Sequence, residues 1–138
     1  MPVERKIIEP KNDKLNVSRN FNLPHSPGIR AGDFIFLSGM LSTDPSTGER
    51  SPGTMAHETR QTLTNMRHLL ESAGSSLERV VKLNVLIYDM LEFENMNGVF
   101  KQFFPVDPPA RTVCGVQLSA GMKIEIECIA LIADRSAQ

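Results

Sequence analysis

Two ionisable residues in the last third of the chain are suited by type and position to chemistry on a small carboxylic acid. Arg111 directly follows Pro108-Pro109-Ala110 and opens a predicted strand, and its planar guanidinium is the side chain best matched to a carboxylate. Glu125 lies in the last predicted strand, where a partly buried carboxylate would suit general acid–base work. Each residue also has a purely structural interpretation. Arg111 could pair with a protein carboxylate, and an isolated strand glutamate commonly forms a surface salt bridge.

The hydrophobic pattern around these residues predicts an α+β fold. Apolar residues at three- and four-residue intervals predict one helix from about Met55 to Ala73, ended by Gly74, and a second helix capped by Asp89. Strands are predicted as a short edge strand at 7–8, a strand buried on both faces at 34–37, and three more at 80–88, 111–118 and 122–132. The order β-β-α-β-α-β-β, with possible extra edge strands, predicts two helices packed on one face of a mostly antiparallel sheet.

Alternation along the last two strands assigns their side chains to the faces of this sheet. In the final strand the set expected to face the helices is Ile124, Ile126, Cys128 and Ala130, so Glu125 would point away. In the strand before it the set expected under the helices is Thr112, Cys114, Val116 and Leu118. Arg111 is therefore expected on the same face as Glu125.

That second face of the sheet mixes charged residues with large apolar ones, which are Leu86, Tyr88, Ile129 and Leu131. It could be a solvated face on which Lys82 pairs with a carboxylate across strands. It could also be a subunit interface, because apolar groups gathered there would form a sizeable exposed patch. The apolar residues favour the interface.

Composition argues against several classes of protein. The formal net charge is −1 and no basic block occurs, which disfavours nucleic acid as a partner. The two cysteines form no CxxC motif and the three histidines lack metal-ligand spacing, so we expect free thiols and no metal. No apolar run approaches the ~18 residues of a membrane span, and no signal-peptide pattern opens the chain. We expect a soluble cytoplasmic protein with a single domain at 1–138, comprising an edge strand and loop at 1–23 and a core at 24–132.

Several segments, in the same order and spacing over residues 24–132, resemble the RidA/YjgF family of reactive intermediate (imine) deaminases. The segment Ile29–Gly39, closing on Ser-Gly, is similar to the family's first long strand. Thr59–Asn65 resembles the start of its first helix, and Ala73–Leu77 resembles the segment after that helix. The most specific match is Pro109-Ala110-Arg111-Thr112 together with Lys123-Ile124-Glu125-Ile126-Glu127.

The resemblance implies a chorismate-mutase-like α+β fold assembled as a homotrimer around a central barrel of sheets, with sites in the clefts between subunits. It also implies hydrolysis of reactive enamines and imines, such as 2-aminoacrylate, to 2-oxo acids and ammonium, with no metal or organic cofactor. Carried over by position, Arg111 would bind the substrate carboxylate and Glu125 would place or activate the attacking water. The resemblance further assigns pocket-lining or supporting roles to Ser38, Gly39, Asn97 and Phe100.

Three positions depart from the family pattern. His25 stands where most members have tyrosine or phenylalanine, and it is either a pocket residue or a loop side chain. Val113 replaces a common cysteine, although its backbone carbonyl could still hold water, and Met40 replaces the usual glutamine. These changes suggest a divergent subgroup that uses a larger or differently substituted enamine.

The main alternative is a trimer without catalytic activity. It would bind a 2-oxo acid or a similar small carboxylate as a sensor, or expose apolar surface in a chaperone-like role. Arg111 would be needed by the sensor and irrelevant to the chaperone. A nuclease, an activity attributed to some relatives, is disfavoured by the charge and by the lack of a basic, aromatic-interleaved patch.

Overall fold

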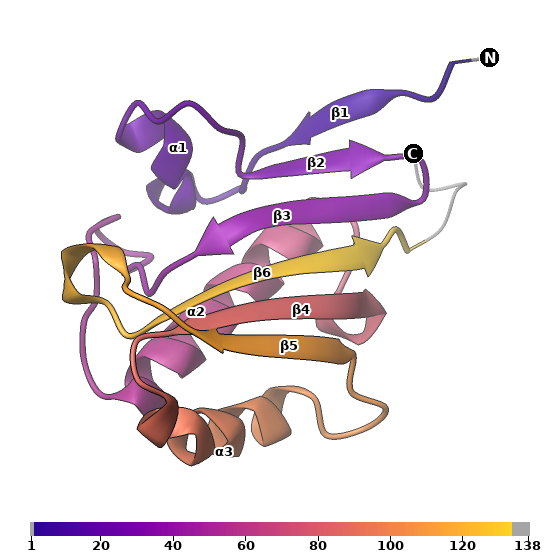
Figure 1. Cartoon of the computed structure of the whole chain (residues 1–138). Coiled ribbons are helices and arrows are strands. Elements are labelled where there is room, and N and C mark those ends of the chain that lie inside the picture. The colour runs from indigo at the N-terminus through magenta and orange to yellow at the C-terminus, as the bar shows by residue number, and fades with distance from the viewer. Residues whose placement is uncertain (1, 134–138) are drawn as a thin grey trace.

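The computed structural model describes residues 2–133, and its six strands form a single sheet (Figure 1). The strands are β1 (Arg5–Ile8), β2 (Gly28–Ala31), β3 (Phe34–Met40), β4 (Val80–Ile87), β5 (Ala110–Gly115) and β6 (Ile124–Leu131). Their order across the sheet is β1-β2-β3-β6-β4-β5, and only β4 and β5 are parallel neighbours. The predicted α+β fold is confirmed, and β1 contains the predicted edge strand.

The two longer helices, α2 (Met55–Ser72) and α3 (Phe93–Phe103), occupy the segments where the periodic apolar pattern predicts them. The short α1 (Val17–Asn20) lies in the segment predicted to be a loop. The Thr54 hydroxyl accepts a hydrogen bond from the backbone of His57 and so caps α2, and Gly74 after its end has a φ of 78°. Asp89 caps a 3₁₀ turn that leads directly into α3. The other 3₁₀ turns lie at Asp13–Leu15, Leu77–Arg79 and Ser119–Gly121.

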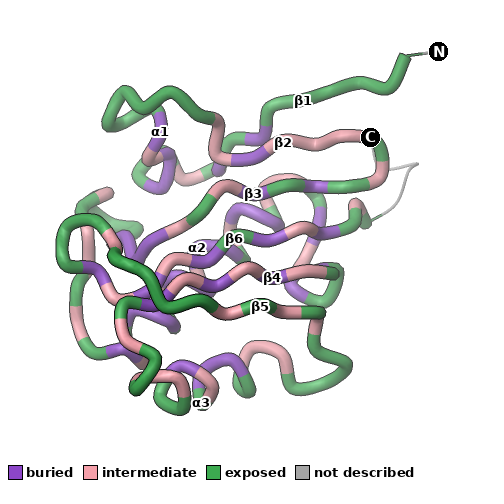
Figure 2. Tube along the Cα trace, in the orientation of Figure 1, coloured by how far each residue is buried: buried purple, intermediate pink, exposed green. Residues whose placement is uncertain are grey.

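The core lies between the sheet and the helices α2 and α3, which cover one face of the sheet (Figures 1 and 2). Its fully buried members include Leu63, Met66 and Leu70 from α2, which meet Ile35 and Ile126 from the sheet. Along β6, buried side chains alternate with more exposed ones, as the two-residue period of a strand requires. Within residues 2–133, no helix combines the length and apolar character needed to cross a membrane.

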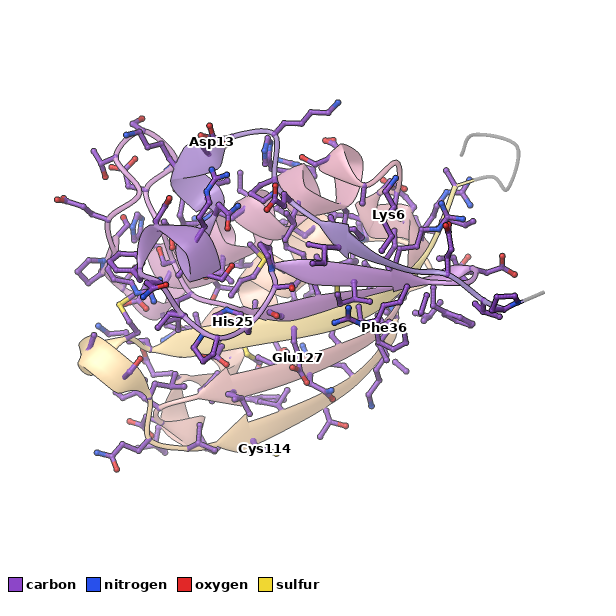
Figure 3. All side chains as sticks on the ribbon, turned by 90° about the horizontal axis from the view of Figure 1, so that it is seen from above. Lys6, Asp13, His25, Phe36, Cys114 and Glu127 are labelled. Atoms are coloured by element: carbon purple, nitrogen blue, oxygen red, sulfur yellow. The ribbon has the colours of Figure 1, made fainter. Side chains whose placement is uncertain are left out.

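The face of the sheet turned away from α2 and α3, called the open face below, carries large apolar side chains. Phe34 and Phe36 are each 43% exposed, and their ring centroids lie 6.5 Å apart. The prediction that 34–37 is buried on both faces is therefore wrong, because only Ile35 and Leu37 point into the core. Figure 3 labels Phe36, Glu127 and Cys114, which stand on three different strands and are all exposed.

Polar pairs between strands also occur on the open face. The Lys82 ammonium donates to the Thr112 hydroxyl at 3.0 Å, so its partner is not the carboxylate of the solvated-face interpretation. Glu127 accepts a hydrogen bond from the Asn84 amide at 2.9 Å. The open face thus combines satisfied polar pairs with exposed aromatic rings.

Candidate active site

Arg111 lies on the helix-covered face of the sheet, at the edge formed by β5. It pairs in register with Leu83 of β4, whose side chain is fully buried. Val113, two residues on, packs against the core, whereas Thr112 and Cys114 are exposed. The prediction that Arg111 shares a face with Glu125 is wrong. Both alternating sets of β5 contain apolar residues, and the set beneath α3 is the one that carries the guanidinium.

Helix α3 holds the Arg111 guanidinium in one orientation. Arg111 Nη1 donates to Asn97 Oδ1 at 2.8 Å. The guanidinium carbon also lies 5.1 Å from the ring centroid of Phe100 and 5.6 Å from that of Phe93. These three contacts come from one face of α3 and combine a hydrogen bond with cation–π attraction.

Arg111 borders a hollow of about 450 Å³, called the Arg111 pocket below, lined by Leu83, Asn97, Phe100, Lys101, Phe104, Pro108, Pro109 and Arg111. Burial lowers the pKa of Arg111 below its ordinary value, although a guanidinium remains protonated at neutral pH. Among residues 2–133, no carboxylate forms an ion pair with it. The guanidinium therefore retains N–H donors that can bind an anionic ligand.

Glu125 projects from β6 towards the open face, because its neighbours Ile124 and Ile126 are fully buried on the opposite side. The pairing of β3 with β6 shifts register between Leu37 and Met40, and the Glu125 carboxylate packs closely against the backbone there. A Cβ added at Gly39 would come within 2.9 Å of Glu125 Cδ, so the glycine is needed for this approach. Such irregularities often occur beside functional sites, where they redirect a side chain.

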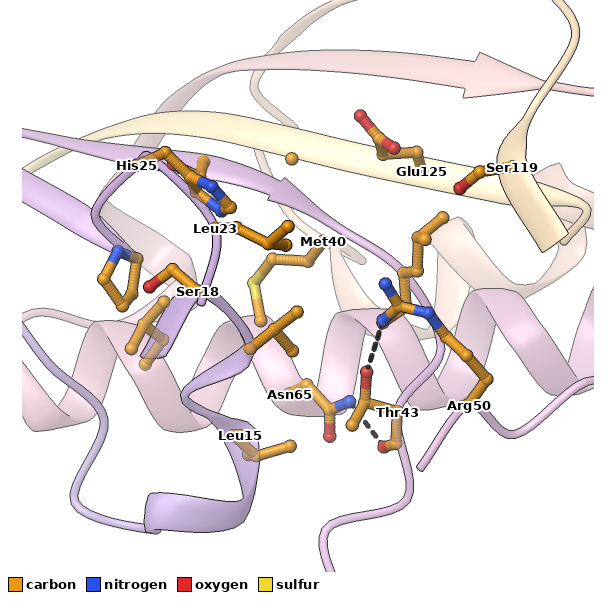
Figure 4. A pocket seen from close by; sticks show the side chains of 16 residues that line it. Leu15, Ser18, Leu23, His25, Met40, Thr43, Arg50, Asn65, Ser119 and Glu125 are labelled. Carbon is orange, nitrogen blue, oxygen red and sulfur yellow. Dashed lines mark hydrogen bonds between the residues drawn. The ribbon is translucent and has the colours of Figure 1, made fainter. Parts of the chain in front are cut away.

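A second hollow, of about 380 Å³, lies beside Glu125 and is called the Glu125 pocket below (Figure 4). It is lined by Leu15, Val17, Ser18, Leu23, His25, Pro27, Ser38, Gly39, Met40, Leu41, Thr43, Arg50, Asn65, Leu69, Ser119 and Glu125. Ser38 is fixed there, since its hydroxyl donates to the Ser26 carbonyl at 2.6 Å. His25 lines this pocket and is exposed at the same time. The volume is in the range of small-molecule sites.

The structure sorts the predicted site residues into two groups on opposite faces of one sheet. The group around Arg111 contains Asn97 and Phe100. The group around Glu125 contains His25, Ser38 and Gly39. Val113 lines neither pocket. Arg111 and Glu125 therefore project from opposite faces of the sheet and line different pockets within one chain.

Comparison with known proteins places this arrangement in a family. The family model described as Endoribonuclease L-PSP matches residues 19–132. The chain belongs to this family. A RutC family protein of Pyrococcus horikoshii is 43% identical over 108 residues, which is 78% of this chain and 86% of that protein. A 2-iminobutanoate/2-iminopropanoate deaminase of Bos taurus is 39% identical over 109 residues, which is 78% of this chain and 80% of the bovine protein.

Solved structures of Rid proteins have the same fold. YyfA of Yersinia pestis, a member of the conserved Rid protein family, matches with a TM-score of 0.84 at 27% identity, covering 94% of this chain and 100% of that one. RidA of an Antarctic Psychrobacter species matches with a TM-score of 0.75 at 34% identity, covering 79% of this chain and 89% of that one. The predicted membership of the RidA/YjgF family is confirmed.

In this Rid-family chain, some residues in or beside the two pockets could not be predicted from the sequence. Phe93 and Lys101 lie close to Arg111, and periodicity could place them on α3 without showing that they face a ligand site. Arg50 and Asn65 line the Glu125 pocket. Arg50 belongs to an irregular loop, where no hydrophobic period indicates which way a side chain points.

Proposed function

We propose that this chain hydrolyses reactive enamines and imines of 2-amino acids, such as 2-aminoacrylate, to 2-oxo acids and ammonium. The observation that carries the proposal is the Arg111 guanidinium. Asn97 and two aromatic rings orient it at a small-molecule pocket, and no carboxylate of residues 2–133 pairs with it. Relatives named 2-iminobutanoate/2-iminopropanoate deaminase support this activity.

Arg111 binds the substrate carboxylate and fixes the position of the adjacent imine carbon. The planar guanidinium can donate two parallel hydrogen bonds to a carboxylate. Because it is partly desolvated, its attraction for an anion is stronger than it would be in water. Asn97 keeps the guanidinium from rotating away, and the rings of Phe93 and Phe100 cover it without competing for the anion.

Glu125 places the attacking water and accepts its proton. An enamine first becomes an imine by taking a proton on its β-carbon and losing one from its nitrogen. The water oxygen then bonds to the imine carbon, and the C=N electron pair moves to nitrogen, which takes up a proton. Collapse of the resulting carbinolamine forms the C=O bond and releases ammonia, which leaves as ammonium. Because the imine carbon is already electrophilic, orientation and proton transfer are the main requirements. These steps need no metal or organic cofactor.

The site is completed between copies of the chain in a homotrimer. Arg111 and Glu125 lie on opposite faces of one sheet, so a shared substrate requires Arg111 from one copy and Glu125 from another. The exposed Phe34, Phe36 and Leu131 of the open face give the copies an apolar surface to bury. Burying this face would bring the Glu125 pocket of one copy to an edge of the next.

The proposal is tested by comparing the rate of imine hydrolysis by the wild type with the rate for Arg111→Ala. An amino-acid oxidase generates imines in situ, and the formation of ammonium and 2-oxo acid is followed. A charge-assisted hydrogen bond contributes about 1.5–3 kcal/mol, so Arg111→Ala should lower kcat/KM at least about 10-fold. Arg67→Ala is a matched control, because Arg67 also stacks on a phenylalanine, Phe103, but lines neither pocket.

Unchanged turnover in Arg111→Ala would contradict the assignment. Lack of turnover by wild type, with 2-oxo acids still raising its Tm, would favour the sensor.

A further inference from the structure

Arg50 is a second arginine whose guanidinium borders a pocket, in this case the Glu125 pocket (Figure 4). It lies just after the turn at 44–48 and forms an isolated antiparallel bridge with Thr43. Arg50 Nη1 donates to the Thr43 hydroxyl at 3.2 Å, and the guanidinium carbon lies 5.9 Å from the Phe21 ring centroid. The side chain is thus held by a hydroxyl and a ring, both of them neutral.

The charge of Arg50 is only partly compensated within the chain. Among residues 2–133, no carboxylate lies within ion-pair distance of it, whereas the exposed Arg19 pairs with Asp13 at 2.9 Å. Burial lowers the pKa of Arg50, and the Glu125 carboxylate in the same pocket opposes that lowering. A guanidinium has five N–H donors, and its desolvation is costly unless anionic or polar acceptors engage them.

The pocket around Arg50 is equipped to receive a polar ligand group. The side chains of Thr43, Asn65 and Ser18 line the same hollow, and the Asn65 amide is already bonded to the Thr43 carbonyl at 2.8 Å. The positive charge of Arg50 offsets the negative charge of Glu125, which would otherwise repel an anion. The hollow therefore provides acid–base chemistry at Glu125 and an anion-binding group at Arg50.

We propose that Arg50 is a specificity-determining residue that binds a second carboxylate, so that the favoured substrates are imines of dicarboxylic 2-amino acids. The inference rests on the proposed function. In the completed site, Arg111 of a neighbouring copy binds the carboxylate next to the imine carbon, Glu125 lies at that carbon, and Arg50 binds the far end of the side chain. A monocarboxylic imine with an apolar side chain leaves Arg50 without an anion.

The inference predicts a change in substrate preference. Imines are generated by amino-acid oxidases from aspartate or glutamate and, for comparison, from 2-aminobutyrate or leucine. Wild type should favour the dicarboxylic imines. Arg50→Leu should reduce this preference, measured as the ratio of kcat/KM values, by about 10- to 100-fold, and Arg50→Lys should retain part of it. Arg79→Leu is the control, since Arg79 is exposed and lines neither pocket.

If Arg50 only supports Glu125 or the loop and binds no carboxylate, a different result is expected. Arg50→Leu would then lower kcat/KM for all imines by a similar factor and leave the ratio unchanged, which would overturn the inference. Thermal unfolding of each variant shows whether it is folded. Arg50→Gln, which keeps a hydrogen-bonding group without the charge, gives a second measurement if the leucine variant does not fold.

Equilibrium binding separates failure of this inference from failure of the proposed function. Calorimetry compares the binding affinity of 2-oxoglutarate with that of 2-oxobutyrate, a measurement that does not require turnover. Tighter binding of 2-oxoglutarate by wild type, lost in Arg50→Leu, supports the second carboxylate subsite even if no imine is hydrolysed. Equal binding of both acids by wild type and Arg50→Leu overturns it, even if imine hydrolysis is fast.

Discussion

Subunit complementation is the most direct test of a site shared between copies. Arg111→Ala and Glu125→Gln each remove one half of the proposed site, and each homotrimer should be nearly inactive. The two variants are co-expressed with different affinity tags, and mixed trimers are purified through both. In a mixed trimer, a cleft regains both groups when its Arg111 comes from the Glu125→Gln chain and its Glu125 comes from the Arg111→Ala chain.

The composition of a mixed trimer sets the size of the recovery. A trimer purified through both tags contains two chains of one variant and one of the other, so about one cleft in three regains both groups. The imine assay should therefore recover about a third of the wild-type activity per chain. Mixing Arg111→Ala with Asn97→Ala is a matched control. Both residues belong to the Arg111 pocket of the same chain, so this mixture should recover no more than the residual activity of its parents. No recovery in the Arg111→Ala and Glu125→Gln mixture would refute the shared site.

Two further predictions follow from single contacts. Asn97→Ala removes the hydrogen bond that orients the Arg111 guanidinium but keeps the guanidinium itself. The kcat/KM for imines should therefore fall by roughly 3- to 10-fold, less than in Arg111→Ala. An unchanged value would show that the aromatic rings alone suffice to orient the guanidinium. Burial raises the pKa of the Cys128 thiol to about 12, so the unfolded chain loses its thiol proton first as pH rises from about 9 towards 12. Stability from this group should be complete below about pH 9 and fall by up to about 1.4 kcal/mol per pH unit above it. Urea unfolding of wild type and Cys128→Ala, compared between pH 8 and 11, should show the steeper loss in wild type.

Elements with a long, regular pattern could be predicted from the sequence, and side-chain directions at the sheet edge could not. The stripe from Leu63 to Leu70 predicts α2 because it continues over several turns. The two alternating sets of β5 are both mixed, so the sequence does not show that Val113 rather than Cys114 meets the core. That ambiguity placed Arg111 on the wrong face.

The resemblance to the RidA/YjgF family names candidate site residues that no periodicity could indicate. Ser38, Gly39 and His25 come from a strand end and a loop, yet they gather at the Glu125 pocket. Arg50 was missed because it stands at a loop position that neither the resemblance nor a regular pattern singles out. The exposure of Phe34 and Phe36 could not be predicted for a different reason. A strand whose outer face another copy of the chain could cover has the same continuous apolar run as a strand buried on both faces within its own chain.

Glu58 joins the parts of the chain that hold Glu125, and its stability effect can be worked out from its contacts. It is fully buried in the first turn of α2. Its two carboxylate oxygens accept hydrogen bonds from the backbone N–H groups of Gly53 at 3.1 Å and Lys123 at 2.8 Å. The Lys123 ammonium lies 3.6 Å from the same carboxylate, but that side chain is 29% exposed. Lys123 precedes Ile124 and Glu125 directly, so the carboxylate ties the start of β6 to α2.

The two kinds of contact predict different costs. Glu58→Ala leaves two backbone N–H groups without acceptors, which costs about 1–3 kcal/mol each, so a loss of roughly 2–6 kcal/mol in the free energy of unfolding is expected. Lys123→Met removes a partly exposed ion pair and keeps both backbone bonds, so its loss should be at most about 1 kcal/mol. Urea unfolding at equal protein concentration measures both, since association into the proposed trimer would also contribute to stability. Equal losses in the two variants would mean that the ion pair, and not the backbone bonds, holds β6 to α2. The larger loss in Glu58→Ala would instead show that a buried carboxylate outside both pockets fixes the strand from which Glu125 projects.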